Sequence, residues 1–271
     1  MVNPRPPEAA GTTPARPFLP FAATALAVAG WHIGPAATWL PPVRRALAPA
    51  LDGRGAPDRV ALTFDDGPDP DSTPHFLRAL DRLSVRATFF VLGERLRLHP
   101  ELGRRMVAEG HELAVHGWRH ERPWRPRPAR DTHELRRAVE TVVRVTGTRP
   151  VWYRPPYGIL TGGRWAAARR LGLRPVLWSA WGRDWTARAT PDSVLAEVTS
   201  TLRGGGTVLL HDSDAMSAPG SWRASLGALP GLAAVCHARG LTLGPLAVHG
   251  LRPPPGDEPY AYVNAPLGTA G

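Results

Sequence analysis

Two adjacent carboxylates, Asp65 and Asp66, directly follow the apolar and β-branched run 61–64 and precede the turn residues Gly67-Pro68. Alternate side chains of a strand point to opposite faces, so the two carboxylates cannot share one orientation if the strand continues through them. Held in different directions by a tight turn, they could do two jobs, one binding a metal ion and the other moving protons. The plain alternative is a solvated Asp-Asp turn, which loops use freely.

His116 and His120 form a second pair of chemical groups. Their i, i+4 spacing places them on one face of a helical turn, which suits two imidazoles on one metal ion. Taken alone, the pair is better explained as a surface coincidence. With an aspartate at the same rim it supplies two imidazoles and one carboxylate, a set that leaves positions open for water and substrate.

The elements that must position these groups alternate along the chain from Arg59 onward, with short β-rich runs separated by helical patterns. This alternation predicts parallel βα units in an α/β fold. The predicted strands cover residues 59–64, 86–92, 111–115, 151–153, 174–178, 206–210 and 241–243.

Helix starts and ends have their own signals. Pro74, Pro100 and Pro191 each stand where a first helical turn would begin. Asp131 with Glu134 three residues later predicts a capping box, and Gly147 predicts the end of the same helix.

The polar residues that could do chemistry collect just after the predicted strands. They are Asp65, Asp66, His116, His120, Arg154, Asp184 and His211. In parallel α/β folds the active site lies at the carboxyl ends of the strands, so these segments converge on one face. The placement favours an active site over a solvated turn at the Asp-Asp pair.

With these residues assembled, the chain resembles the polysaccharide deacetylases of the NodB-homology type, a carbohydrate esterase family. Five motifs occur in the family's order over residues 58–248: Thr63-Phe64-Asp65-Asp66-Gly67-Pro68, His116-x-x-x-His120, Arg154-Pro155-Pro156-Tyr157-Gly158, Asp184-Trp185 and Leu210-His211-Asp212. The resemblance implies an incomplete, distorted (β/α)7 barrel, which agrees with the seven predicted strands.

The resemblance also implies a role for each motif residue. Asp66, His116 and His120 would hold a divalent metal ion, zinc first and cobalt or nickel as alternatives. Asp65 would be the general base, oriented by Arg154, and His211 the general acid, tuned by Asp184. The backbone N–H of Tyr157 would help hold the oxyanion. Trp185, with Trp124 and Trp181, is a candidate to stack on sugar rings.

Two positions depart from the family pattern. Gly117 stands where the family usually has Ser or Thr, so we expect a loop that lacks a hydroxyl hydrogen bond and is less rigid. Trp181 stands where the family often carries Asp. Neither change removes a ligand or a proton carrier, so both bear on substrate preference more than on activity.

The amino-acid composition limits the kinds of binding partner that we expect. The formal net charge is +10 and every basic residue except histidine is arginine, a balance that suits an anionic surface such as a phosphate-bearing cell envelope. We find no arginine cluster interleaved with aromatic residues of the kind that nucleic-acid-binding proteins carry, and we expect no nucleic-acid partner. The single Cys236 excludes an internal disulfide and a cysteine-based zinc site, and its apolar surroundings predict a core position.

The N-terminal region is predicted as a disordered segment over 1–17, a membrane anchor over 18–40 and a linker over 41–57, with a flexible tail over 249–271. From Phe18 to Leu40 no formally charged residue occurs, a span long enough to cross a bilayer of ~30 Å. The alternative for this stretch is an amphipathic segment lying on the catalytic domain.

Together these features predict a membrane-anchored, metal-dependent deacetylase that removes N-acetyl groups from a GlcNAc-type glycan of the cell envelope. We expect it at the cell membrane with the catalytic domain on the extracytoplasmic side and without an obligate protein partner. The same chemistry on a lipid-linked sugar is one rival. A non-catalytic envelope protein that binds glycans is another, although binding alone needs no proton carriers.

Overall fold

The computed structural model describes residues 18–251. The predicted disordered segment 1–17 lies outside the described residues, as does the part of the predicted tail beyond Leu251.

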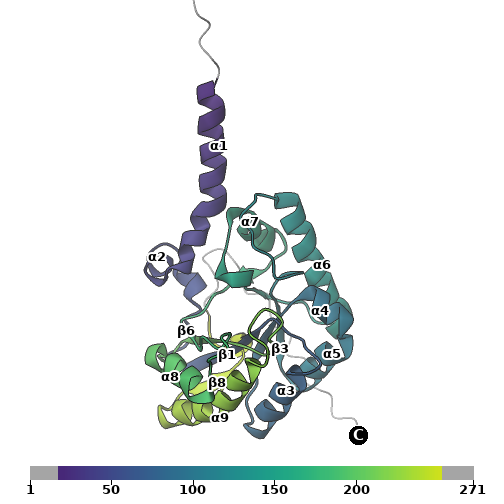
Figure 1. Ribbon diagram of the computed structural model, residues 1–271, viewed down its shortest axis with the longest axis vertical. Helices are drawn as coiled ribbons and strands as arrows, with labels where there is room; N and C mark the ends of the chain where they lie inside the picture. The colour runs from purple at the N-terminus through teal and green to yellow at the C-terminus, as the bar shows by residue number, and fades with distance from the viewer. Residues whose placement is uncertain (1–17, 252–271) are drawn as a thin grey trace, which may run out of the picture.

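One curled, open parallel sheet forms the centre of the described chain (Figure 1). Its strands are β1 (Arg59–Asp65), β2 (Thr88–Val91), β3 (Glu112–Val115), β4 (Trp152–Tyr153), β5 (Arg174–Pro175), β6 (Ala180–Trp181), β7 (Thr207–His211) and β8 (Thr242–Gly244). The hydrogen-bonded order is β5-β4-β3-β2-β1-β7-β6, with β8 pairing with β1. The predicted α/β class with an incomplete barrel therefore agrees with a half-barrel sheet.

All seven predicted strands overlap an observed one, and the sequence missed only β6 among the described strands. This strand has two residues, Ala180 and Trp181, which pair with Val208 and Leu209 of β7. Two residues are too few to show the alternation of apolar and polar side chains that identifies a strand.

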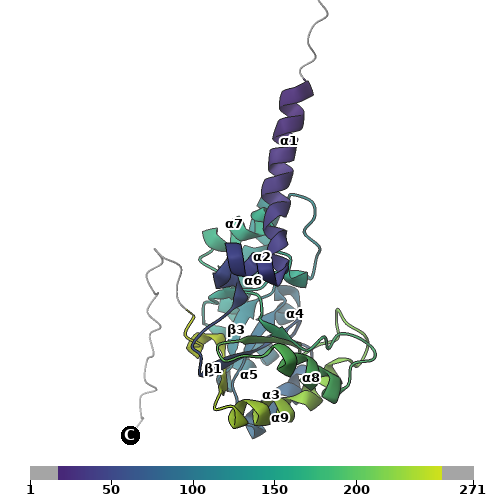
Figure 2. The same ribbon diagram turned by 90° about the vertical axis from the view of Figure 1, so that its left-hand side faces the viewer.

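Helices surround the sheet (Figures 1 and 2). They are α3 (Thr73–Arg82), α4 (Gly93–Leu98), α5 (Pro100–Ala108), α6 (Pro128–Thr146), α7 (Gly162–Arg170), α8 (Pro191–Thr201) and α9 (Trp222–Ala238), with the 3₁₀ turns η3 (Pro156–Gly158) and η4 (Leu246–Val248). The prolines at 74, 100 and 191 lie in the first turns of α3, α5 and α8, as predicted.

The predicted start of α6 is wrong. The helix begins at Pro128, and Arg127 rather than Asp131 is its N-cap residue. Proline is well suited to the first helical position, so the helix starts four residues earlier and Asp131 falls within its first turn. The predicted end is confirmed, because Gly147 caps the helix in the left-handed conformation with φ 71°.

The two faces of β1 separate the core from the functional side. Phe64 packs against Phe76 of α3 and Phe89 of β2, with both pairs of ring centroids 5.1 Å apart, in the main core between sheet and helices. Ala61 belongs to a smaller cluster on the opposite face of the sheet. Because side chains alternate, Thr63 and Asp65 share the face of Ala61. The predicted core position of Cys236 is confirmed, since this cysteine is free and buried in the main core.

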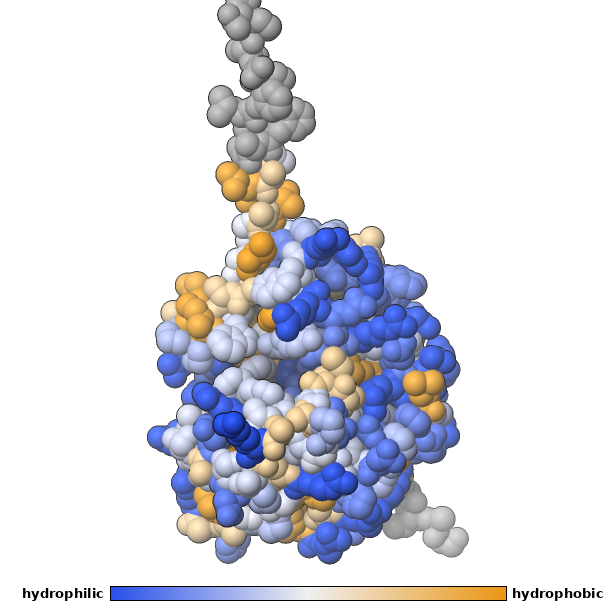
Figure 3. Space-filling view, viewed as in Figure 1, coloured by the Kyte–Doolittle hydropathy of each residue, from blue (hydrophilic) through white to orange (hydrophobic). Residues whose placement is uncertain are grey.

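The N-terminal helix α1 (Phe18–Ile33) projects from the body in both ribbon views (Figures 1 and 2). Leu26, Val28 and Ile33 on it are exposed, and Figure 3 shows hydrophobic atoms gathered along this helix above a largely hydrophilic body. Within the described chain, no helix combines the length and the apolar content that crossing a membrane requires. The predicted transmembrane segment 18–40 is therefore not confirmed.

Residues 41–57, predicted as a linker, instead form structure that packs on the body. They include α2 (Pro41–Leu47) and the 3₁₀ turn η2 (Pro49–Asp52), preceded by η1 (Gly34–Trp39). The buried Arg44 holds them: its Nε donates to Asp52 Oδ1 at 2.8 Å and its Nη2 donates to the carbonyl of Trp178 at 2.9 Å. The Pro- and Ala-rich sequence of this segment could not predict a buried ion pair or a hydrogen bond to a carbonyl of a distant segment.

The folded region also extends beyond residue 248, the predicted end of the catalytic domain. His249 is buried, and its Nε2 lies 3.1 Å from the carbonyl oxygen of Gly53 and 3.0 Å from that of Gly205. The start of the predicted tail therefore packs against the segments that precede β1 and β7.

Candidate active site

The two adjacent aspartates stand at the carboxyl end of β1 and have different partners. Asp65 is the last residue of the strand, whereas Asp66 adopts left-handed backbone with φ 79°. Both side chains are buried. The chain turns at Asp66, so the two carboxylates face different neighbours although they are consecutive in sequence.

Arg154 binds Asp65 inside the curl of the sheet. Its Nη1 donates to Asp65 Oδ1 at 2.7 Å and to Thr63 Oγ1 at 2.8 Å, and its Nη2 donates to the carbonyl of Leu177 at 2.9 Å. The guanidinium carbon lies 4.0 Å from the ring centroid of Phe90. Burial raises the pKa of Asp65, and the charge of Arg154 opposes that rise. The arginine thus fixes the carboxylate in position and favours its ionised form.

Asp66, His116 and His120 form a compact group of three possible metal ligands, with one donor atom of each within 4.8 Å of the others. Asp66 Oδ1 lies 3.4 Å from His116 Nε2 and 3.6 Å from His120 Nε2. Asp65 Oδ2 is 3.8 Å from His116 Nε2, so the predicted base borders the same group.

The local chemistry fits a divalent cation. Asp66 Oδ1 is buried without a hydrogen-bond partner among the described residues, and burial raises the pKa of Asp66 to about 7. Burial also lowers the pKa of His116 well below its usual range and that of His120 to about 3. Neutral imidazoles beside a buried carboxylate oxygen that has no hydrogen-bond donor among the described residues are a donor set that suits a metal ion.

The orientation of His116 supports the same conclusion. Its Nδ1 lies 2.8 Å from the carbonyl oxygen of Arg154, which can only accept a hydrogen bond. The proton therefore belongs on Nδ1, and the lone pair of Nε2 faces Asp66. Metal-binding histidines commonly have such a partner on the second ring nitrogen.

His211 and Asp184 form a second pair near the rim, in which Asp184 is buried and His211 is partly exposed. His211 Nδ1 lies 2.9 Å from Asp184 Oδ1, and the His211 backbone N–H donates to Asp184 Oδ2 at 2.7 Å. Burial alone would lower the pKa of His211, but the carboxylate of Asp184 outweighs it and the pKa rises to about 10. The imidazole is therefore protonated at neutral pH and can donate a proton from Nε2.

The β1–β7 ladder sets the two predicted proton carriers side by side. Asp65 pairs in register with His211, the last residue of β7. The base and the acid suggested by the family resemblance therefore end neighbouring parallel strands.

Tyr157 and Trp185 border the same region. Tyr157 has φ 60° within η3, and its ring centroid lies 4.2 Å from that of His120. The ring centroid of Trp185 lies 6.2 Å from that of His211. The structure thus brings all nine predicted site residues to one rim, while their individual roles stay predictions.

The two departures from the family pattern have structural consequences. Gly117 has φ 110°, a conformation that side chains rarely adopt, and its carbonyl accepts from the Gly93 N–H at 2.9 Å. The loop therefore has a backbone anchor in place of the missing hydroxyl. Trp181 joins a row of aromatic rings, 5.6 Å from Trp178 and 5.1 Å from Trp185 between centroids.

Sequence reasoning missed two supporting hydroxyls. Thr63 binds Arg154 from the residue two before Asp65, and strand periodicity could have indicated that both face the same side. Ser225 of α9 donates its hydroxyl hydrogen to Asp184 Oδ2. No local pattern links Ser225 to a residue 41 positions earlier.

Comparisons with known proteins agree with this geometry. Residues 52–176 match the family model described as polysaccharide deacetylase. A chitooligosaccharide deacetylase of Bradyrhizobium sp. (strain ANU 289) is 43% identical over 155 residues, which cover 56% of this chain and 70% of the relative. The peptidoglycan-N-acetylglucosamine deacetylase PgdA of Listeria monocytogenes is 36% identical over 57% of this chain and 32% of its own.

A solved structure gives the same result at the level of the fold. The family 4 carbohydrate esterase from Streptomyces lividans, in complex with acetate, superposes with a TM-score of 0.62 and 31% identity. The match covers 70% of this chain and 93% of that one. Since the motifs, the half-barrel and these likenesses agree, the chain belongs to the polysaccharide deacetylase family, whose deacetylases are hydrolases that act on carbon–nitrogen bonds.

Proposed function

We propose that this protein is a metal-dependent deacetylase that removes N-acetyl groups from an N-acetylglucosamine-type glycan of the cell envelope. The observation that carries the proposal is the pairing of two proton-transfer groups, Asp65 with Arg154 and His211 with Asp184, around one three-donor cluster. The names of the similar proteins, which act on chitooligosaccharides and peptidoglycan, support this substrate class.

Asp66, His116 and His120 would hold the metal ion, for which we propose zinc, with cobalt or nickel as alternatives. Two imidazole nitrogens and one carboxylate oxygen are a donor set that suits such ions and leaves positions open. The chemistry that a bound divalent cation supplies is polarisation of the acetyl carbonyl and acidification of water.

Asp65 would accept the proton of the attacking water. Its carboxylate borders the cluster, with Oδ2 3.8 Å from His116 Nε2, and its other oxygen is occupied by Arg154 at 2.7 Å. Because Arg154 is wholly buried and has several acceptors, it holds the base in one orientation throughout the reaction.

His211 would give a proton to the departing amine, since an amine leaves readily only when protonated. Asp184 holds the imidazole by Nδ1, which directs the Nε2 proton away from the carboxylate. The raised pKa of His211, about 10, keeps this proton available over the physiological range.

The backbone N–H of Tyr157 would donate to the oxyanion of the tetrahedral intermediate, and Trp185 would contact the sugar. A location at the outer face of the cell membrane stays part of the proposal. It rests on the uncharged stretch 18–40 and on the exposed apolar side chains of α1.

A lipid-linked N-acetylated sugar is a second candidate substrate. It is favoured by Trp39 in η1, which is exposed and lies with its ring centroid 6.3 Å from that of Trp181. Aromatic contacts thus connect the apolar N-terminal region with the row of rings that ends at His211.

The test uses the full chain loaded with zinc and measures acetate released from a chitooligosaccharide, from peptidoglycan and from a lipid-linked N-acetylated sugar. We expect release from the first two and loss of release when a chelator removes the metal. Release from the lipid-linked sugar alone would transfer the assignment to that substrate. No acetate from any of the three would refute the deacetylase proposal.

A further inference from the structure

The segment between β3 and α6, together with the first turn of α6, concentrates positive charge. Arginines occupy positions 119, 122, 125, 127 and 130, and prolines at 123, 126 and 128 separate several of them. Proline restricts the backbone, so the arginines are carried on a stiffened loop. The loop also carries Trp124 between Arg122 and Arg125.

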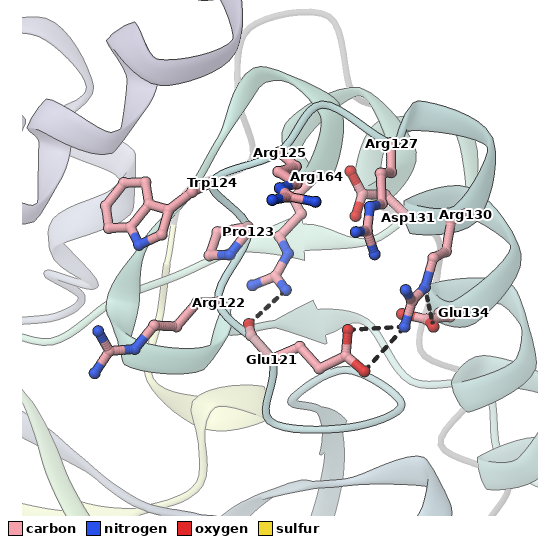
Figure 4. A pocket seen from close by; sticks show the side chains of 10 residues that line it. All are labelled: Glu121, Arg122, Pro123, Trp124, Arg125, Arg127, Arg130, Asp131, Glu134 and Arg164. Atoms are coloured by element: carbon pink, nitrogen blue, oxygen red, sulfur yellow. Dashed lines mark hydrogen bonds and ion pairs between the residues drawn. The ribbon is translucent and has the colours of Figure 1, made fainter.

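The loop encloses an open cavity of about 230 Å³ together with the start of α6 and α7 (Figure 4). Five arginines and three carboxylates are among its lining residues, namely Arg122, Arg125, Arg127, Arg130, Arg164, Glu121, Asp131 and Glu134. In Figure 4 the side chains of Arg127 and Arg164 project into the space between the loop and α6. We refer to this space as the arginine cavity.

The three carboxylates do not neutralise the five arginines. Two of these carboxylates, those of Glu121 and Glu134, both pair with Arg130. Arg130 pairs with Glu121 at 2.8 Å and with Glu134 at 2.7 Å. Over residues 18–251, no ion pair is formed by the arginines at 122, 125, 127 and 164. The cavity therefore has an excess of positive charge.

Two buried atoms also lack hydrogen-bond partners within the described chain. Arg164 Nη2 donates to the carbonyl of Glu121 at 2.8 Å, but Arg164 Nη1 has no acceptor. Asp131 Oδ2 has no donor. The guanidinium groups that a ligand can reach are those of the exposed Arg122, Arg125 and Arg127, and each can contact an oxyanion with two parallel hydrogen bonds.

The arginine cavity borders the catalytic centre through one aromatic ring. The guanidinium carbon of Arg122 lies 5.0 Å from the ring centroid of Tyr157, and that ring is 4.2 Å from the ring of His120. A glycan held at the metal cluster would therefore extend a neighbouring substituent toward this positive surface.

We propose that the arginine cavity binds an oxyanion, a carboxylate or a phosphate, carried by the glycan next to the N-acetyl group that is removed. The inference rests on the proposed function and adds a substrate class, namely acidic glycans in preference to neutral ones. The chemistry shared by the two anions is a planar or tetrahedral set of oxygens that several guanidinium groups can bind.

The experiment compares four substrates for the zinc-loaded full chain, matched in length. The first substrate is a neutral N-acetylglucosamine oligomer, and the second carries 3-O-lactyl carboxylates on alternate sugars. The third is the carboxamide form of the second substrate, and the fourth carries a phosphate ester. We expect kcat/KM for the carboxylate form to exceed that of its amide by about tenfold, mainly through KM, and to fall with added salt. Preference for the phosphate ester alone would identify phosphate as the ligand.

Arg127→Gln and Arg125→Gln separate a binding role from general charge. Each substitution should reduce, several-fold, the ratio of kcat/KM for the carboxylate substrate to kcat/KM for its amide. Both side chains are exposed, so the fold should persist. Arg104→Gln, on the exposed side of α5 and outside the cavity, should leave the ratio unchanged.

Acetate release from all four substrates without any preference for charge would overturn this inference and leave the deacetylase proposal intact. A preference that survives both cavity substitutions would also overturn it. Should no substrate release acetate, calorimetric affinity for the carboxylate form against its amide decides whether the cavity binds an anion, independently of catalysis.

Discussion

At the scale of single residues, substitutions at Asp65 and Asp66 test whether one carboxylate is the general base and the other a metal ligand. Asp65→Asn keeps the shape, can still be held by Arg154 and leaves the three metal donors unchanged. We expect normal zinc content and a fall in turnover of ~10²-fold or more, the scale attributed to one general base. Zinc content by elemental analysis and acetate release are measured on the same preparation.

Asp66→Asn should fail in a different way. It removes the one carboxylate of the three-donor cluster, so both zinc and activity should be lost, and excess metal should restore part of each. Equal loss of zinc in both variants would mean that the two carboxylates act together as ligands. Full activity of both variants would exclude the two carboxylates from catalysis and from metal binding.

Asp184→Asn tests how the acid is kept protonated. In the folded enzyme the pKa of His211 is raised to about 10, so the proton is lost, and activity falls, as pH rises through that value. Without the carboxylate, burial lowers the pKa of His211, and only the charges of Asp66 and Asp65 still raise it. We expect the alkaline limb of the pH–rate profile to move to lower pH and activity at pH 8 to fall.

Ser225→Ala is the matched control for this shift. Its hydroxyl binds the same carboxylate but leaves the charge of Asp184 in place, so the alkaline limb should move much less. An unchanged profile in Asp184→Asn would remove Asp184 from any part in proton transfer.

The residue pairs differ in how far sequence could predict them. The family resemblance named Arg154 for Asp65 and Asp184 for His211, and both pairs are in contact at 2.7 and 2.9 Å. It could not name Ser225 or the acceptor carbonyl of Leu177, because these contacts come from segments with no motif of their own. Packing, rather than local pattern, brings them to the site.

At the scale of elements, the long and regular segments were predictable and the short ones were not. The apolar run of β1 and the glycine after α6 are strong local signals. By contrast, β6 has only two residues, and the apparent capping box of Asp131 and Glu134 led to a wrong start for α6, which begins at Pro128. The largest difference between the predicted and the observed elements lies in the N-terminal segment. Its helix stops at Ile33, and η1 begins with Gly34-Pro35, residues that disfavour helix continuation.

Arg44 offers a test of how that segment is held to the barrel. Arg44→Met leaves Asp52 buried with Arg54 alone and removes the hydrogen bond to the Trp178 carbonyl. Breaking a buried ion pair costs about 3–5 kcal/mol, so the free energy of unfolding should fall by that order. Denaturant titration gives the value.

Arg45→Met, a change to the exposed neighbour of Arg44, should alter the free energy of unfolding by no more than about 0.5 kcal/mol. Hydrogen exchange of residues 34–52 in Arg44→Met should accelerate relative to β1. If both variants are equally stable, the buried pair does not hold the segment.

At the scale of the whole molecule, the charge of +10 and the apolar α1 suggest attachment to an anionic surface. We predict that the full chain remains in the membrane fraction after a high-salt wash. Leu26→Glu combined with Val28→Glu, both on exposed positions of α1, should release it without loss of deacetylase activity. Immunoblots of the washed fractions report the outcome.

Two results would contradict this attachment. Complete release of the unmodified chain by salt would indicate a purely electrostatic association. Retention of the double glutamate variant would show that α1 is not the attachment element. External protease on wall-free cells tests the predicted extracytoplasmic side, because a barrel on that side should be cleaved.

The pairing of Asp65 with His211 has a consequence for how this enzyme can change over evolution. Strands have a period of two, so one residue inserted within β7 would turn His211 to the opposite face and separate it from Asp184. The same insertion in the glycine run 204–206 before β7 would leave the strand phase intact. Length variation among descendants of this chain should therefore be confined to the loops, while the strand that ends in the acid keeps a constant length.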